Sequence, residues 1–304
     1  MKIIYLFLSL LCITFLVFIL IKSRETYTYA HPHILKYRHK SSNVNTTVIP
    51  KKVMQTYFDI SKIPKKVYNN IDVYANGFEH IIYDDNSALL FLDEFYSKDV
   101  VNAFNKLQNG AHKADLLRYC LLYIYGGIYL DIKTELITPL TDIFYSKPSG
   151  GGVQLSASDF QRATFGERSS KLVDPSTNSD IDIYVVLMHA KNGIYNGVIA
   201  AKPRNKIFLE LIDHILRITS TESYIPYGIF VEHFLTVLSS NIKTPITLSK
   251  TLNSEFGRVY FFNETCTNNE SDCSDGLDRY SLCCYIYDND KKIIKVRYSD
   301  YPWK

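Results

Sequence analysis

The clearest pattern along the chain is a helical repeat of apolar positions followed directly by a strand repeat. Apolar residues recur at helical spacing through residues 111–125, and Gly126-Gly127 follows, as is common where a helix ends. Apolar and polar residues then alternate through residues 128–133, which is the period of a half-buried strand. The pattern therefore predicts a helix, a glycine turn and a strand in this order.

Similar patterns divide the rest of the chain into strands and helices. Strands are expected at residues 49–57, 80–83, 183–189 and 197–201, and in the tail at 258–262, 284–287 and 292–298. Helices are expected at residues 87–95, capped by Asn86 or Ser87, and at 205–218 and 228–239. Strands that alternate with helices predict one α/β domain over residues 49–304, with a cysteine-containing C-terminal tail packed on it.

The N-terminus predicts a single membrane-spanning helix. Residues 3–21 carry no charge, and Lys2 and Lys22 lie on either side of them. As a helix this stretch is roughly 28 Å long, close to the thickness of the bilayer core. A cleaved signal peptide would have a shorter apolar core and small residues at a cleavage site. We therefore expect a transmembrane anchor at residues 1–22 and a polar stem at residues 23–48.

The charged residues and the cysteines favour opposite sides of the membrane for the body of the protein. Positive residues gather after the span, which favours a cytosolic body. Glycosylation sequons at Asn45, Asn263 and Asn269 favour the lumen of the Golgi or the endoplasmic reticulum. So does a group of cysteines, Cys266, Cys273, Cys283 and Cys284, which suits disulfides better than a zinc site because no Cys-x-x-Cys pair occurs. We expect a lumenal body, with the cytosolic orientation still open.

The amino-acid composition excludes few classes of binding partner. The formal net charge of +3 is too small to indicate nucleic acid binding. The 24 tyrosines suit sugar or base binding, because each offers a large apolar ring with a hydrogen-bonding tip. A general bias toward Ile, Lys, Asn and Tyr explains this number equally well.

Charged residues gather on the predicted helix and strand. Asp115 and Arg118 are three residues apart and therefore share one helix face, away from the apolar stripe. Tyr129, Asp131 and Lys133 share the polar face of the strand. Because ligands of α/β sheets bind beyond the carboxyl ends of strands, Asp131 is placed to hold a metal-bound diphosphate or a sugar hydroxyl. A surface ion pair between Asp115 and Arg118 is the alternative.

Residues 111–140 resemble the sugar-binding segment of glycosyltransferase family 32, in which an Ala-Asp-x-x-Arg-Tyr helix precedes Gly-Gly-x-Tyr-x-Asp-x-Asp. Residues 49–57 are similar to the opening strand of the family, and residues 196–203 to a later segment. The resemblance implies a GT-A-like fold, a Rossmann-like mixed sheet flanked by helices. It also implies transfer of a hexose, with retention, from a UDP- or GDP-hexose to a glycan, glycolipid or glycoprotein acceptor.

The resemblance also implies roles for individual residues. Asp115 and Arg118 would contact the sugar or ribose of the donor, and Asp131 would be the first acid of the DXD motif. The remaining donor-binding residues would be Gln55, Thr56 and Tyr57 around the base, together with Tyr129 and Asn196.

The second acid of the motif is missing, because the chain reads Asp131-Ile132-Lys133. The Mn²⁺ or Mg²⁺ ion that the family implies is therefore in doubt, and three explanations stay open. Lys133 itself supplies the positive charge for the leaving diphosphate. Alternatively, Glu135 completes an altered metal site, on the same face if the strand continues. In the third, Lys133 pairs with a carboxylate in a degenerate site, and the protein binds or scaffolds glycans without catalysis.

Overall fold

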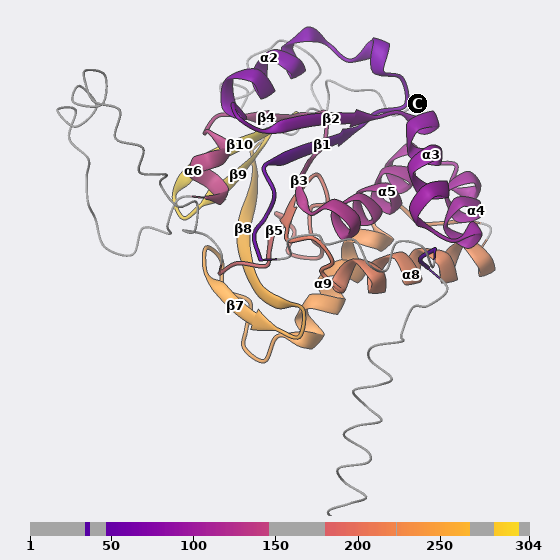
Figure 1. The fold of residues 1–304 in the computed structure, drawn as a ribbon. Helices are drawn as coiled ribbons and strands as arrows, with labels where there is room; N and C mark the ends of the chain where they lie inside the picture. The colour runs from indigo at the N-terminus through magenta and orange to yellow at the C-terminus, as the bar shows by residue number, and fades with distance from the viewer. Residues whose placement is uncertain (1–33, 37–46, 146–179, 223, 268–282, 298–304) are drawn as a thin grey trace, which may run out of the picture.

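The computed structural model describes residues 34–36, 47–145, 180–222, 224–267 and 283–297 (Figure 1). Their strands are β1 (Lys52–Thr56), β2 (Glu79–Tyr83), β3 (Gly127–Leu130), β4 (Thr134–Leu136), β5 (Ile183–Leu187), β6 (Val198–Ala201), β7 (Thr251–Ser254), β8 (Gly257–Thr267), β9 (Cys283–Asp288) and β10 (Lys291–Arg297). Their helices are η2 (Ile60–Lys62), α2 (Lys65–Tyr74), α3 (Asp85–Phe95), α4 (Lys98–Lys106), α5 (Gly110–Tyr125), α6 (Leu140–Phe144), α8 (Ile207–Thr221) and α9 (Ile229–Asn241).

These strands form one mixed sheet in the order β2-β1-β3-β6-β5-β8-β9-β10-β4, with β7 beside β8. Strand β1 is parallel to both β2 and β3, so the carboxyl ends of the three strands meet at one edge. Strand β6 is antiparallel to β3 and to β5, and β5 is parallel to β8. A mixed α/β sheet flanked by helices confirms the expected fold class. The cysteine-containing tail supplies β8, β9 and β10, and is therefore part of the sheet itself.

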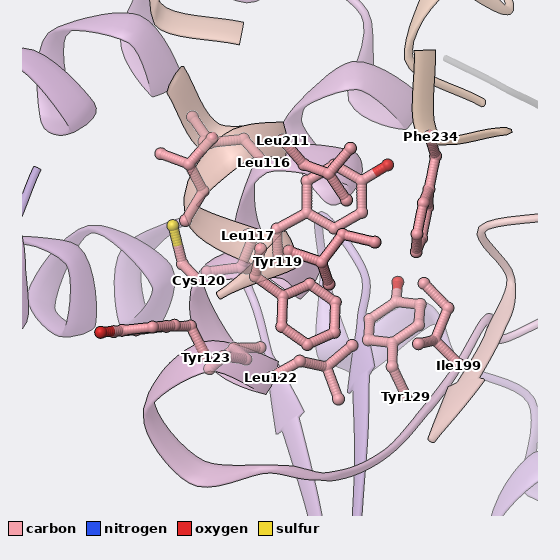
Figure 2. Packing of buried hydrophobic residues seen from close by; sticks show 14 of the residues in the cluster. Leu116, Leu117, Tyr119, Cys120, Leu122, Tyr123, Tyr129, Ile199, Leu211 and Phe234 are labelled. Atoms are coloured by element: carbon pink, nitrogen blue, oxygen red, sulfur yellow. The ribbon is translucent and has the colours of Figure 1, made fainter. Parts of the chain in front are cut away.

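Each face of the sheet buries its own core. In β3, Tyr129 packs in the core that α3, α4, α5, α8 and α9 build, whereas Ile128 and Leu130 pack in the core with α2 and α6. Figure 1 shows the larger helix group on one side of the strands, and Figure 2 shows Tyr129 and Ile199 of the sheet within the same cluster as Tyr119 and Phe234. The strand alternation read from the sequence thus corresponds to two buried faces.

The glycine turn between α5 and β3 is fixed by close backbone contacts. Gly126 ends α5 with a φ of +63°, and its N–H donates to the carbonyl of Leu122. A Cβ on Gly126 would lie 2.5 Å from the backbone nitrogen of Pro203, and one on Gly127 would lie 2.7 Å from the carbonyl oxygen of Lys52. Both positions therefore require glycine, because a side chain has no room and positive φ disfavours it.

The strand predicted at residues 128–133 is wrong in its second half. Strand β3 ends at Leu130, and the carbonyl of Asp131 accepts from the N–H of Thr134 at 2.9 Å and from its hydroxyl at 2.6 Å. These bonds close a turn, and the chain resumes as β4 at the far end of the sheet order. Alternating polarity does not reveal such a turn, because Ile132 and Lys133, the residues in its middle, are both buried.

Other expectations differ in detail. The helix expected at residues 87–95 begins at Asp85, and its cap is Asp84, whose carboxylate accepts from the N–H of Ser87 at 2.8 Å. Neither Asn86 nor Ser87 is the cap, because both lie inside the helix. Helices η2, α2, α4 and α6 and strands β4 and β7 were not expected. The other predicted strands and helices in the described residues are present within a few residues of their expected ends.

Three predictions meet the described residues only in part. Cys266 and Cys284 form a disulfide between β8 and β9, which confirms the disulfide expectation for this pair, while Cys273 lies outside the described residues. No helix in the described parts of the chain is long and apolar enough to cross a membrane. The predicted anchor at residues 1–22 and most of the predicted stem lie outside them.

Candidate active site

A cavity opens at the edge where β1, β2 and β3 end. Helix α5 contributes residues between Gly110 and Arg118, and the turn after β3 contributes Asp131, Ile132 and Lys133. The lining residues that carry the argument are Thr56, Tyr57, Asp84, Arg118, Asp131 and Lys133. This position agrees with the general rule that ligands of α/β sheets bind beyond the carboxyl ends of strands.

Asp131 is held at this edge by its backbone. Its N–H donates to the carbonyl of Gly197 at 2.8 Å, next to β6. The side-chain amide of Gln55 donates to its carbonyl at 3.4 Å. A Cβ on Gly197 would lie 2.7 Å from Oδ2 of Asp131, so the glycine leaves the space that the carboxylate needs. The carboxylate is thereby fixed between two sheet strands.

Both oxygens of the Asp131 carboxylate face cationic groups. Oδ1 lies 3.3 Å from Nη1 of Arg118 and accepts from the hydroxyl of Tyr129 at 3.2 Å, and Oδ2 lies 3.5 Å from Nζ of Lys133. Burial opposes ionisation, but the charges of Arg118 and Lys133 outweigh it and hold the pKa of the Asp131 carboxyl below its ordinary value. Asp131 is therefore a carboxylate at neutral pH.

Lys133 is buried, with 6% of its side chain exposed. Burial lowers the pKa of its ammonium, and the charges of Asp131 and Glu264 oppose this effect. Its Nζ also lies 5.6 Å from the centre of the Tyr195 ring. The ammonium thus stands at the cavity with an acid at close range and an aromatic face beside it.

Arg118 connects α5 to the sheet. Its Nη2 lies 3.4 Å from Oδ1 of Asp115, its Nη1 donates to the carbonyl of Asn196, and its guanidinium lies 4.4 Å from the centre of the Tyr129 ring. Burial disfavours its charge, yet the groups around it, including Asp131 and Asp115, outweigh burial and raise its pKa. The suggested surface ion pair with Asp115 is wrong, because both side chains are buried against the sheet.

Asp115 lies behind Arg118. Its Oδ1 accepts from the amide of Asn196 at 2.9 Å, and the same amide donates to the hydroxyl of Tyr119 at 2.7 Å. Burial raises the pKa of Asp115 to about 6, although Arg118 and Asn196 oppose the shift. This carboxylate therefore titrates well above Asp131 and supports Arg118 from the side away from the cavity.

The predicted site residues fall into two groups. Thr56, Tyr57, Arg118, Asp131 and Lys133 line the cavity together. Four others, Gln55, Asp115, Tyr129 and Asn196, are buried and do not line it, and neither does Glu135.

The buried group supports the lining group by direct contacts. The Gln55 amide lies between the ring of His80, at 2.8 Å, and the carbonyl of Asp131, and the hydroxyl of Tyr129 bonds Thr56 at 2.8 Å. These residues fix the position of the cavity wall, so we assign them positioning roles.

Sequence reasoning missed several residues of the site. Asp84 lines the cavity where β2 ends, and Lys113 lines it from α5 while its ammonium bonds Asp85 at 2.7 Å. The acidic run Asp84-Asp85 after a predicted strand was a signal that could have revealed them. Glu264 gave no such signal, because its place near Lys133 depends on the pairing of β8 with β5.

The described residues do not fit a divalent cation at Asp131. Both carboxylate oxygens already face a guanidinium or an ammonium, and like charge opposes a metal there. The expectation that Glu135 lies on the same strand face as Asp131 is wrong, because the strand does not continue and Glu135 lies in β4 opposite Lys295. Among the described residues, no group of three His, Cys, Asp or Glu includes Asp131.

Comparison with known proteins agrees with this geometry. Residues 51–149 match the family model described as a glycosyltransferase sugar-binding region containing a DXD motif. The chain is also similar to curated mannosyltransferases over part of its length. The initiation-specific alpha-1,6-mannosyltransferase of Saccharomyces cerevisiae is 36% identical over 69 residues, which cover 22% of this chain and 14% of that protein.

Two further relatives are similar over somewhat longer segments. The initiation-specific alpha-1,6-mannosyltransferase of Candida albicans is 28% identical over 101 residues, 31% of this chain and 26% of that protein. Inositol phosphoceramide mannosyltransferase 1 of Schizosaccharomyces pombe is 30% identical over 98 residues, 30% of each. The matched segments thus span less than a third of the length of these relatives. Residues 51–149 of this chain are therefore similar to the sugar-binding region of glycosyltransferases that contain a DXD motif, although the chain has lysine at position 133.

Proposed function

We propose that this protein transfers a hexose, with retention, from a UDP- or GDP-hexose to a glycan, a glycolipid or a glycoprotein. The observation that carries the proposal is the cavity in which Arg118, Asp131 and Lys133 converge at the carboxyl edge of the sheet. A nucleotide-sugar has a base and ribose, a diphosphate and a sugar with several hydroxyls. The cavity offers a matching group for each of them.

Each part of the nucleotide-sugar is assigned to residues of the cavity as follows. Thr56 and Tyr57 line the end of the cavity that suits the base, and Asp84 supplies a carboxylate for hydroxyls. Asp131 is ionised and accepts from sugar hydroxyls, while Lys133 faces the diphosphate. Transfer breaks the bond between the anomeric carbon and the diphosphate oxygen, and the acceptor oxygen forms the new bond on the same face of the sugar while its proton passes to the leaving diphosphate. The leaving nucleoside diphosphate keeps the electron pair of the broken bond.

Lys133 stabilises this leaving charge in place of the second acid and its metal. A positioned cation in a site with little water strongly stabilises charge that develops in the transition state. Lys133 is buried and its Nζ is held near Asp131, so little reorganisation is needed. The reaction is therefore proposed to need no divalent ion.

A donor screen tests the proposal. The full-length chain is purified in detergent and incubated with a set of UDP- and GDP-hexoses, with and without EDTA, and nucleotide release is measured. We expect release with at least one donor, activity that survives EDTA, and loss of activity in Asp131→Ala. Release that stops in EDTA would contradict metal independence, and an Asp131→Ala variant with unchanged release would contradict the site.

One observation favours a second candidate. The contact between Lys133 and Asp131 also fits a degenerate site, in which the acid is neutralised and the protein binds or scaffolds glycans. Failure of every donor to be hydrolysed or bound, together with retained glycan binding, would favour this candidate.

We also propose that the body of the protein lies in the lumen of the Golgi or the endoplasmic reticulum, anchored by residues 1–22. The disulfide between Cys266 and Cys284 supports this location, because disulfides persist in oxidising compartments. Protease protection of the body in intact microsomes tests the orientation. Digestion without detergent would contradict it.

A further inference from the structure

A second groove lies beside the N-terminal end of α5. Residues at and just before the start of α5, at the end of α8 and in the segment between α8 and α9 line it, among them Asn109, His112, Thr219, Glu222, Tyr224 and Tyr227. None of these residues lines the donor cavity, which uses Gly110, Lys113, Ala114 and Leu117 on another face of the helix. Helix α5 thus lies between this groove and the donor cavity.

Two tyrosines give the groove an exposed aromatic wall. Tyr224 is 75% exposed and Tyr227 is 70% exposed. Such rings offer an apolar face with a hydrogen-bonding tip, which matches the C–H face and the hydroxyl rim of a hexose. The rest of the wall is polar, with the hydroxyls of Ser220 and Thr221 and the carboxylate of Glu222. This mixture suits a sugar better than a lipid chain.

His112 is the buried polar group of the groove. The residue is 5% exposed, and its Nε2 has no hydrogen-bond partner among the described residues. Its ring lies 6.4 Å from that of Tyr227 and 5.1 Å from that of Phe230, measured between ring centres. Burial lowers the pKa of His112, so the ring is neutral at neutral pH and has one donor and one acceptor nitrogen. A buried nitrogen without a partner is unfavourable, and a ligand hydroxyl would satisfy it.

The groove adjoins the reactive edge of the sheet. His112, Asp115 and Tyr119 follow one another at helical spacing along one face of α5, so the groove leads toward the Asp115–Arg118 pair. Loss of solvent and the charges of Asp115 and Asp131 raise the pKa of Tyr227. Its phenol is therefore within electrostatic reach of both carboxylates, although much of the residue is open to solvent.

We propose that this groove binds a hexose of the acceptor, with the sugar stacked on Tyr227 and one of its hydroxyls bonded to Nε2 of His112. Its role as the acceptor site rests on the proposed transferase function. Tyr224 extends the aromatic wall for a second sugar, so the groove favours a glycan over a bare lipid or peptide hydroxyl.

Binding of simple sugars tests this proposal without turnover. Methyl α-mannoside, methyl α-galactoside and methyl β-galactoside are titrated against the full-length chain and followed by saturation-transfer NMR. The test variants are Tyr227→Ala and His112→Phe. The second variant keeps an aromatic ring packed against Phe230. The matched controls are His214→Phe, another histidine whose Nε2 lacks a partner in the described residues, and Leu90→Ala, an exposed apolar residue on α3.

We expect at least one hexoside to bind, and Tyr227→Ala to weaken its binding about five- to tenfold. His112→Phe should weaken it about three- to tenfold, and both controls should leave it unchanged. UDP and GDP binding should stay within about twofold in all four variants, because the nucleotide lies in the other cavity. Hexoside binding that is unchanged in both groove variants, or absent in the wild type, would overturn the inference.

The same samples separate this inference from the proposed function. Donor hydrolysis without acceptor depends on the donor cavity alone. A chain that hydrolyses a donor but binds no hexoside through Tyr227 keeps the proposed function and loses the acceptor groove. A chain that binds hexosides through Tyr227 but neither binds nor hydrolyses any donor keeps the groove as a glycan site and loses the transferase function.

Discussion

The Nζ atom of Lys133 lies 3.5 Å from Oδ2 of Asp131, while Nη1 of Arg118 lies 3.3 Å from the other oxygen of the same carboxylate. With Asp115, the cluster has two acids and two bases and so no net charge when all are ionised. An acid at position 133 would leave a net charge of about −2, which a divalent cation would balance. The charge of this one residue therefore decides whether the cluster carries the negative charge that a divalent cation would balance.

Lys133→Met should abolish most of the activity. The change keeps an unbranched side chain of similar length but removes the charge that faces the leaving diphosphate, so we expect kcat for donor hydrolysis to fall about 100-fold or more. Assays of nucleotide release measure this kcat. Lys98→Met is the matched control, since Lys98 is exposed and its ion pair is with a surface acid, Asp93. Equal activity of the two variants would contradict a catalytic role for Lys133.

Lys133→Asp should create a metal dependence that the wild type lacks. The substitution restores two acids around the turn and removes the ammonium that opposes a cation. We expect Mn²⁺ to raise the melting temperature of Lys133→Asp, because binding to the folded state alone stabilises it, and to leave the wild type unchanged. Thermal unfolding with and without Mn²⁺ measures the effect. Lys133→Asn, neutral and of similar size to Asp, controls for loss of the lysine, and an equal Mn²⁺ shift in wild type would contradict the charge argument.

The difference in the free energy of unfolding between the wild type and Asp115→Asn should depend on pH. Burial raises the pKa of Asp115 to about 6 in the folded state, above its unfolded value, so the folded state binds the proton more tightly. The favourable contribution is present below about pH 4 and is lost as the pH rises to about 6, a change of about 3 kcal/mol. Urea unfolding of both proteins between pH 4 and 7.5 measures the difference. A difference that stays constant across this range would contradict the raised pKa.

Gly126→Ala and Gly127→Ala should each destabilise the fold by about 2–4 kcal/mol. In both, positive φ and a Cβ closer than 3 Å to backbone atoms act together. Gly77→Ala is the matched control, because Gly77 has a φ of +81° but nothing within 4 Å of an added Cβ, and we expect it to cost only about 1 kcal/mol. Chemical denaturation measures all three. Three equal losses would show that crowding contributes nothing at the α5–β3 turn.

Loss of the disulfide between Cys266 and Cys284 should reduce the free energy of unfolding by about 3 kcal/mol. The bond closes a loop with a sequence separation of 18, and this is the loop-closure contribution expected for that length. Urea unfolding of the double Cys→Ser variant measures it. Cys120→Ala provides the comparison with a buried thiol that forms no disulfide. Stability of the double variant equal to that of wild type would contradict a structural role for the bond.

The amino-acid sequence by itself determined the local elements and the motif. The helical repeat, the two glycines and the strand repeat correctly predicted α5, the turn and β3, because side-chain period and glycine preference are local properties. Placing Asp131 at the carboxyl edge of the sheet also followed from the sequence, since a strand followed by a polar residue at this point implies it.

Only the tertiary structure decided what surrounds these residues. The turn that ends β3 at Leu130, the burial of Asp115 and Arg118 against the sheet, and the contact of Lys133 with Asp131 depend on where β6 and the carbonyl of Gly197 lie. Likewise, the groove with His112 and Tyr227 joins segments more than a hundred residues apart. Contacts between distant segments have no signature in local periodicity, because packing energies arise only once the chain has folded.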